Sequence, residues 1–132
     1  MKPVSAKITK TLQAGSYINC ADNTGATLLQ VIAVKGYKGV KRRSPICGVG
    51  DWIIAAVKDG DAKIVHEVVQ AVIIRQKKEY RRPNGMRIKF EDNAAVLVNE
   101  KIEPRGSKIK GAVAREVVER FSTIGKISTL IV

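Results

Sequence analysis

The stretch from Val68 to Phe90 reads Val-Val-Gln-Ala-Val-Ile-Ile-Arg-Gln-Lys-Lys-Glu-Tyr-Arg-Arg-Pro-Asn-Gly-Met-Arg-Ile-Lys-Phe. Apolar, strand-like runs stand at both ends, Val68–Ile74 and Met86–Phe90, with Pro83-Asn84-Gly85 between them. Proline presets its own φ, while Asn and Gly tolerate φ > 0, so this triplet is typical of a turn. The pattern therefore predicts a β-ribbon that reverses at Pro83–Gly85.

The predicted ribbon carries positive charge on both of its faces. Seven of the fifteen side chains from Arg75 to Lys89 are basic and one is acidic. A strand that packs on a core is apolar on at least one side, so we expect the ribbon to project from the body. Nucleic acid is the polyanion that fits such a segment best. Projecting residues support no core, so Arg81 and Arg82 are expected to contribute little to stability.

The whole chain is strongly basic. Its 132 residues include 24 Lys and Arg against 12 Asp and Glu, which gives a formal charge of +12 and a pI near 10.0. Lys35–Arg43 and Arg75–Lys89 together hold twelve of the 24 basic residues. Such clustering favours a binding surface over a merely soluble one. The length suits one domain, so residues 1–132 are expected to form a single RNA-binding unit.

Short β-type runs separated by turn residues occupy most of the first hundred positions. Gly36–Gly50 is predicted to be a basic loop between two of them. Strands at this spacing without helices between them indicate an all-β fold, either an antiparallel sandwich or a closed barrel. The predicted strands are Lys7–Leu12, Tyr17–Cys20, Leu28–Val34, Trp52–Val57 (covered on both faces) and Lys63–Ile74, followed by a hairpin of Met86–Phe90 with Ala94–Val98.

The pattern changes after Gly111. Ala112, Val113, Val117 and Phe121 recur at helical spacing, with charged residues largely on the other side. An apolar tail, Ile127–Val132, then ends the chain and is expected to dock on the body. We therefore predict a barrel with a small C-terminal helical appendage.

No catalytic, metal or cofactor site can be assembled from the sequence. Gly48-Val49-Gly50-Asp51 resembles part of a phosphate-binding loop, but it leads into a strand and lacks the Gly-Lys-Ser/Thr ending. His66 is the only histidine and is predicted to lie in a strand, so neither an acid–base set nor a zinc site with Cys20 and Cys47 is expected. No apolar run approaches the roughly 18 residues that cross a membrane. We expect a non-enzymatic protein with no cofactor, metal or membrane partner.

Three basic stretches are candidate nucleic-acid contacts: the ribbon, Lys35–Arg43 and Arg105–Gly111. Glycine permits close approach of the backbone, while Lys and Arg can neutralise phosphates. Only Tyr37 and Tyr80 can be spared for base stacking, so recognition of the backbone and shape of folded RNA is expected. The predicted contact residues are Lys35, Lys38, Lys41, Arg42, Arg43, Arg75, Lys77, Lys78, Arg81, Arg82, Arg87, Lys89, Arg105, Lys108 and Lys110.

Several spaced motifs together resemble one protein family. The first group is Ala71-Val72-Ile73-Ile74, then Asn84-Gly85, Phe90, Asn93 and Val96-Leu97. Two further stretches, Cys20–Ala26 and Gly111–Glu116, stand in the same order along the chain as the similar stretches of the family. The family is the universal large-subunit ribosomal protein that is fourteenth in the conventional series, and the similarity runs from about Ser5 to Val132. The short N-terminal lead and Cys47–Trp52 are more similar to the archaeal and eukaryotic branch than to the bacterial one.

The resemblance implies a five-stranded closed barrel with a projecting β-ribbon and C-terminal helical pieces. It also implies a cytoplasmic, ribosome-bound protein that binds large-subunit ribosomal RNA and joins intersubunit bridges with small-subunit ribosomal RNA during translation. Further implied partners are neighbouring large-subunit proteins, namely the third in the series and a small zinc-ribbon protein, and a subunit anti-association factor such as initiation factor six.

Two other hypotheses follow from the residues alone. One is a free-standing RNA chaperone or single-strand nucleic-acid-binding barrel, which the scarcity of aromatic residues disfavours. The other is a small enzyme that acts on RNA, which the missing acid–base set disfavours. Co-sedimentation of the protein with ribosomes at high salt would separate all three.

Overall fold

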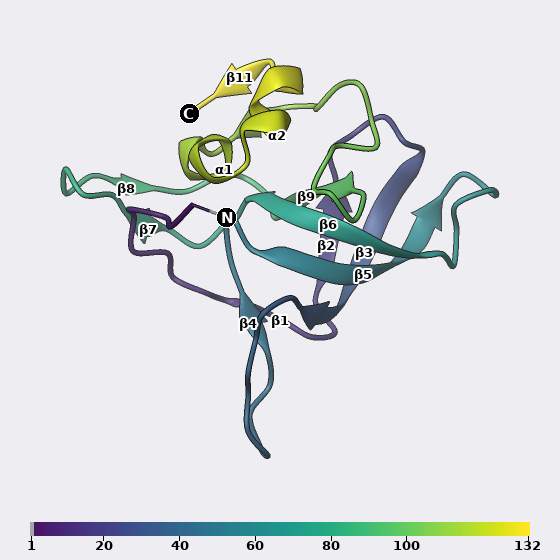
Figure 1. Ribbon diagram of the computed structural model, residues 1–132, viewed down its shortest axis with the longest axis horizontal. Coiled ribbons are helices and arrows are strands. Elements are labelled where there is room, and N and C mark those ends of the chain that lie inside the picture. The colour runs from purple at the N-terminus through teal and green to yellow at the C-terminus, as the bar shows by residue number, and fades with distance from the viewer. Residues whose placement is uncertain (1) are drawn as a thin grey trace.

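The computed structural model describes residues 2–132, and Figure 1 shows the arrangement of their strands and helices. Strands dominate, and the two helices are short and lie near the C-terminal end. The elements are β1 (Leu12–Gln13), β2 (Tyr17–Cys20), β3 (Ala26–Val34), β4 (Ile46–Cys47), β5 (Trp52–Gly60), β6 (Val68–Arg75), β7 (Tyr80–Arg81), β8 (Arg87–Ile88), β9 (Ala94–Val98), β10 (Ala112–Val113), α1 (Arg115–Arg120), α2 (Ser122–Ile127) and β11 (Leu130–Ile131).

Five strands close into a barrel in the order β2-β3-β5-β6-β9. Its neighbouring strands are antiparallel except for β9 and β2, whose parallel pairing closes the barrel. Shifts of register between β3 and β5 mark bulges, which increase strand twist and help a short sheet to curl on itself. The predicted all-β, five-stranded closed barrel is confirmed.

The interior of the barrel is filled by alternate residues of its strands. On β5, Ile53, Ala55 and Val57 are fully buried there, while Ile54 and Ala56 are half-buried on the outside. The prediction that this strand is covered on both faces is therefore wrong for most of its length. Only Trp52 contacts a second apolar cluster on the outside of the barrel.

Cover on both faces occurs on β9 instead. All five of its residues are buried, with Ala95 and Leu97 inside the barrel and Val96 in the second cluster. The second cluster lies between β6, β9 and the C-terminal layer, which contributes Val117 and Ile124 from the two helices. Burial on both sides explains why β9 reads as an unbroken apolar run.

The C-terminal layer packs on the outside of the barrel, at the top of Figure 1. The predicted helical appendage is confirmed, but it begins at Arg115 rather than at Ala112. Ala112 and Val113 instead form β10, which pairs in parallel with Leu130 and Ile131 of β11. The apolar spacing that predicts a helix at Ala112 thus belongs partly to a strand.

The predicted strand Lys63–Ile74 begins too early. β5 continues to Gly60, which is paired with Ala26, and the chain then turns before β6 starts at Val68. The amides of Ile64 and Val65 both donate hydrogen bonds to the Asp61 carbonyl, at 3.0 and 3.1 Å. Ile64 is buried in the barrel core. Because this turn contains a buried apolar residue, its sequence resembles that of a strand.

The predictions for His66, for the hairpin and for the first strand also need correction. His66 lies in this turn with a φ of 69°, not in a strand. Ala94–Val98 does not form a hairpin with Met86–Phe90, because β9 pairs with β6 and β2 while β8 pairs with β7. Within Lys7–Leu12, regular pairing begins only at Leu12, and Lys7 forms an isolated bridge.

Two segments project from the barrel in different directions (Figure 1). We call residues Lys35–Pro45 the arm and residues Lys77–Lys89 the ribbon. The arm leaves the barrel after β3 and returns through β4, which pairs with β1 at its base. The ribbon is the β7–β8 hairpin, and its reversal at Pro83–Gly85 is confirmed, with Gly85 at a φ of 86° and its amide hydrogen-bonded to the Arg82 carbonyl at 2.9 Å.

Candidate nucleic-acid interface

The arm carries five basic side chains and no acidic one. Gly36 at a φ of 80° and Arg42 at a φ of 73° bend its backbone. Its base is fixed to the barrel, because the Lys35 amide donates a hydrogen bond to the Trp52 carbonyl at 2.8 Å and the Lys35 ammonium lies 4.3 Å from the centre of the Trp52 ring. The exposed basic residues of the arm are Lys35, Lys38, Lys41, Arg42 and Arg43.

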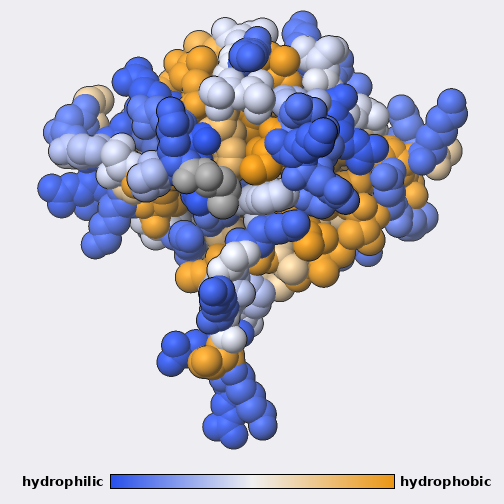
Figure 2. Space-filling view, viewed as in Figure 1, coloured by the Kyte–Doolittle hydropathy of each residue, from blue (hydrophilic) through white to orange (hydrophobic). Residues whose placement is uncertain are grey.

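The ribbon presents a second set of exposed cations. Hydrophilic side chains cover much of both projections in Figure 2. One weak contact lies within this set, a 3.6 Å ion pair between Arg87 and Glu79 in which both side chains are largely exposed. The exposed basic residues of the ribbon are Lys77, Lys78, Arg81, Arg87 and Lys89.

Arg82 differs from its neighbour Arg81, because it is held inside the protein. Its Nε donates to Glu116 Oε1 at 2.7 Å and one terminal nitrogen donates to the main-chain oxygen of Val132 at 2.6 Å. The hydroxyl of buried Tyr80 donates to the same carboxylate at 2.7 Å. The ribbon is thereby tied to α1 and to the end of β11.

Burial and hydrogen bonding have opposite effects on the pKa of Glu116. Burial acts to raise the pKa of Glu116, but the hydrogen bonds from Arg82 and Tyr80 favour the carboxylate and leave its pKa below the usual range. Burial, together with Glu116, raises the pKa of Tyr80, so the phenol remains a hydrogen-bond donor. This closed network leaves the Arg82 guanidinium with little freedom to bind another anion.

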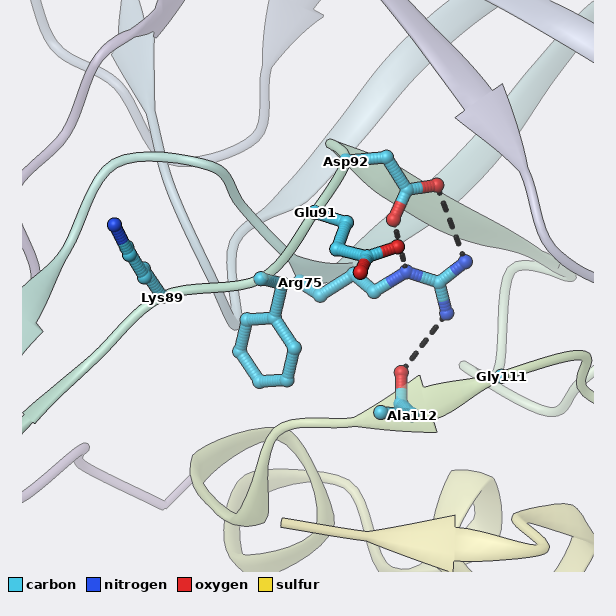
Figure 3. Close-up of a pocket in the computed structure, with 7 residues that line it drawn as sticks. Arg75, Lys89, Glu91, Asp92, Gly111 and Ala112 are labelled. Carbon is cyan, nitrogen blue, oxygen red and sulfur yellow. Dashed lines mark hydrogen bonds and ion pairs between the residues drawn. The ribbon is translucent and has the colours of Figure 1, made fainter.

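Arg75 is also committed to internal contacts, at the end of β6 (Figure 3). Its guanidinium forms two hydrogen bonds with Asp92, at 2.7 and 3.2 Å, and donates to the carbonyl oxygens of Lys110 and Ala112 at 3.0 and 2.9 Å. The hydrogen bond from Arg75 holds the pKa of Asp92 below its usual range. Lys89, by contrast, points away from Arg75 in this view.

The third basic stretch forms a loop packed beside the turn after β2. Asn23 donates to the Ser107 hydroxyl at 2.8 Å and accepts from the Ser107 amide at 3.0 Å. Gly106 allows this close approach, because a Cβ there would lie 2.6 Å from Asn23 Oδ1. Lys108 and Lys110 are exposed, and Arg105 lies 3.5 Å from Glu67 in an exposed ion pair.

Several basic residues near the projections are absent from the RNA-contact residues that the sequence predicts. Lys7 lies beside the ribbon through the isolated bridge to Arg81. Lys10 and Arg120 line a hollow of about 440 Å³ at the base of the arm, together with Lys35, Tyr37 and Asp51. The sequence could have indicated that Lys7 is exposed, because the run Lys7–Leu12 alternates and alternate residues of an extended segment face the same side.

Aromatic side chains contribute little to this surface. Tyr80 is fully buried and Tyr37 is 38% exposed, so of the two tyrosines predicted to be available only Tyr37 can reach a base. Trp52 and Phe90 are half-buried against the second apolar cluster. Contacts to the phosphates and sugars therefore suit the surface better than stacking.

Neither cysteine has the features of a reactive group. Burial and a nearby aspartate raise the pKa of Cys20 and of Cys47 to about 12, so both remain protonated thiols. Among residues 2–132, no three His, Cys, Asp or Glu side chains lie together as metal ligands. Neither α1 nor α2, the helices of the described chain, has the length and apolar character needed to cross a membrane.

The barrel, its basic projections and its C-terminal layer define a small, basic β-barrel protein whose exposed surface suits a nucleic-acid partner. Residues 11–132 match the family model described as Ribosomal protein L14p/L23e. Large ribosomal subunit protein uL14 from Methanocorpusculum labreanum is 52% identical over the full length of both chains. The proteins of the same name from Methanothrix thermoacetophila and Haloarcula marismortui are 52% and 49% identical, again over both full lengths.

The chain belongs to the L14p/L23e family of ribosomal proteins. It is accordingly a structural constituent of the large ribosomal subunit, bound to the ribosome in the cytoplasm, and not an enzyme. The resemblance seen in the spaced motifs is thereby confirmed, and the relatives named above are all archaeal.

Proposed function

We propose that the protein binds large-subunit ribosomal RNA through the arm and the ribbon, and that it contributes to intersubunit bridges with small-subunit RNA during translation. The observation that carries this proposal is the exposed charge of the two projections, each with five exposed Lys or Arg side chains. Glu79 is the single acidic residue within the two segments. Cations that extend beyond a folded body can enter the grooves of RNA and neutralise its phosphates.

The different directions of the arm and the ribbon support contacts with more than one RNA segment (Figure 1). A bridge requires a protein to contact one RNA while it stays anchored to another. Separate projections on a rigid barrel meet that requirement, because each is fixed at its own base: the arm by β1 and β4, and the ribbon by Glu116.

Exposed apolar side chains on the barrel support contacts with proteins as well. Tyr17, Ile32 and Val68 are 58%, 47% and 63% exposed, and such residues favour protein partners over RNA backbone. We propose the third large-subunit protein and a small zinc-ribbon protein as neighbours, and a subunit anti-association factor as a transient partner. These identities come from the family resemblance.

The RNA-binding proposal is tested by removing charge from the arm alone. Lys38, Lys41, Arg42 and Arg43 are changed to Gln in the full-length protein, and affinity for purified large-subunit ribosomal RNA is measured between about 50 and 200 mM salt. For the wild-type protein we expect affinity to fall on the order of 10³-fold or more across this range. Each lost phosphate contact should reduce the slope of log affinity against log salt by about 0.9.

The control removes the same amount of charge elsewhere. Lys58, Lys63, Lys101 and Lys126 are exposed residues outside both projections, and changing all four to Gln should alter the salt slope much less. Equal losses in the two variants would mean that only net charge matters. A flat salt response of the wild-type protein would contradict the proposal, and failure to co-sediment with large subunits at high salt would favour a free-standing RNA chaperone.

A further inference from the structure

The N-terminal segment runs along one edge of the ribbon and is joined to it by an isolated β-bridge. The Lys7 amide donates a hydrogen bond to the Arg81 carbonyl at 3.0 Å, and the two residues form an antiparallel bridge. Ala6 and Ile8 are half-buried against the second apolar cluster. Ser5, Lys7 and Thr9 alternate with them and are exposed, as expected for an extended chain with one face on a core.

The pairing places three like charges in one row. Lys7 lies directly opposite Arg81, and Arg81 lies directly opposite Arg87 on β8. Directly opposed residues of antiparallel strands point to the same face, with Cβ atoms about 4.5–5.5 Å apart. Like charges so placed repel one another and destabilise the pairing. The row is therefore expected to be most favourable when an anion lies over it.

The surface around this row is hollowed on both sides. One hollow of about 230 Å³ is lined by Lys7, Thr9, Arg81 and Arg87. A neighbouring hollow of about 250 Å³ shares Lys7 and Arg81 and adds Ser5, Arg82 and Pro83. No carboxylate lines either hollow, and within residues 2–132 neither Lys7 nor Arg81 forms an ion pair. The Glu79 contact engages only Arg87, at 3.6 Å.

We propose that Lys7, Arg81 and Arg87, flanked by the hydroxyls of Ser5 and Thr9, form a binding face for successive phosphates of an RNA backbone. Alternate residues of an extended chain are spaced about 6.6 Å apart, so Ser5, Lys7 and Thr9 offer donors along a line rather than at a point. Hydroxyl and cationic donors together are the usual ligands of phosphate oxygens, and they carry no sequence preference. This inference rests on the proposed function and adds the N-terminal segment to its contact surface.

The test compares Lys7→Gln with Lys63→Gln in the full-length protein, using purified large-subunit ribosomal RNA. Lys63 is an exposed lysine in the turn between β5 and β6, so both variants lose one exposed charge. We expect Lys7→Gln to reduce the salt slope by about one and Lys63→Gln to leave it unchanged. Thr9→Val, which removes only the hydroxyl, should weaken binding several-fold without changing the slope.

Thermal stability separates binding from a structural role. Because Lys7→Gln removes one of three opposed like charges, its melting temperature should equal or exceed that of the wild type. A lower melting temperature together with an unchanged slope would overturn the inference while the proposed function stands. If the wild-type protein itself shows no salt-dependent RNA binding, the proposed function is overturned. Tight, Lys7-dependent binding of polyglutamate without an RNA effect would assign this face to an acidic protein instead.

Discussion

The guanidinium of Arg82 lies 2.7 Å from the carboxylate of Glu116, whose side chain is only 5% exposed. This ion pair joins the ribbon to helix α1, and the hydroxyl of Tyr80 completes it from the same strand region. Adjacent arginines of the ribbon therefore have different roles. Arg81 is exposed and available to a ligand, whereas Arg82 holds the ribbon on the body. The premise that both side chains project freely is wrong for Arg82, and we therefore expect Arg82 to contribute to stability.

Arg82→Ala should destabilise the protein, while Arg81→Ala should not. Removal of Arg82 leaves the buried Glu116 without its cation, at a cost on the order of 3 kcal/mol. For a domain of this size that corresponds to a fall in Tm of roughly 10 °C. Arg81→Ala should change stability by less than about 0.5 kcal/mol, because this side chain is exposed. Thermal unfolding followed by circular dichroism measures both, and equal Tm values for the two variants would contradict the assigned roles.

Stability should fall at acidic pH, in part through Glu116. Its folded-state pKa lies below the ordinary 4.5, so the unfolded chain binds more protons as the pH falls towards that pKa. The stability that this carboxylate contributes is thus present above about pH 4.5 and is lost as the pH falls through the folded-state pKa. Asp92, whose pKa Arg75 lowers, acts in the same direction.

Glu116→Gln isolates the first contribution to this pH dependence. The variant should be less stable than the wild type at neutral pH, since an amide pairs less well with a guanidinium. Its stability should also fall less steeply between about pH 5 and pH 3, because one titrating group is gone. Urea unfolding at several pH values gives both quantities. Parallel curves for wild type and variant would show that Glu116 does not titrate in this range.

Gly111→Ala should disturb the contacts of Arg75. Gly111 has a φ of 80°, and a Cβ there would lie 2.9 Å from a terminal nitrogen of Arg75. The substitution combines about 1–2 kcal/mol of backbone strain with displacement of the guanidinium from its partners. Gly36→Ala is a matched control, since Gly36 has the same φ of 80° with nothing within 4 Å. The difference in unfolding free energy between the two variants measures the Arg75 contacts, and no difference would mean that these contacts contribute nothing.

Trp52→Ala should lower stability and affect RNA binding only through unfolding. The side chain packs on the second apolar cluster, and its indole Nε1 is buried. Loss of a buried aromatic side chain costs about 3–5 kcal/mol, and the partial exposure of Trp52 favours the lower end. Trp52→Phe keeps an aromatic face beneath Lys35 and should retain most of the stability. Because Trp52 is the only tryptophan, its emission reports this site directly, and strong quenching by RNA would show that a base stacks on it.

Local patterns in the sequence predicted the elements whose identity depends on neighbouring residues. The turn chemistry of Pro83-Asn84-Gly85 predicted the reversal of the ribbon, and short β-type runs between turn residues located most of β2, β3 and β5. The clustering of Lys and Arg indicated both projections, because like charges in a short segment cannot all find partners nearby. The spaced motifs predicted the family, since they resemble its stretches of sequence in order along the chain.

Tertiary structure alone decided which basic residues are free. Arg75 and Arg82 read like the other cations of their segment, but their partners Asp92 and Glu116 lie 17 and 34 residues away. The pairing of β9 with β6 and β2, and of Lys7 with Arg81, is equally long-range. A basic side chain becomes structural or available according to whether folding brings a carboxylate to it. That outcome depends on the closure of the barrel and the packing of its C-terminal layer, which no local pattern contains.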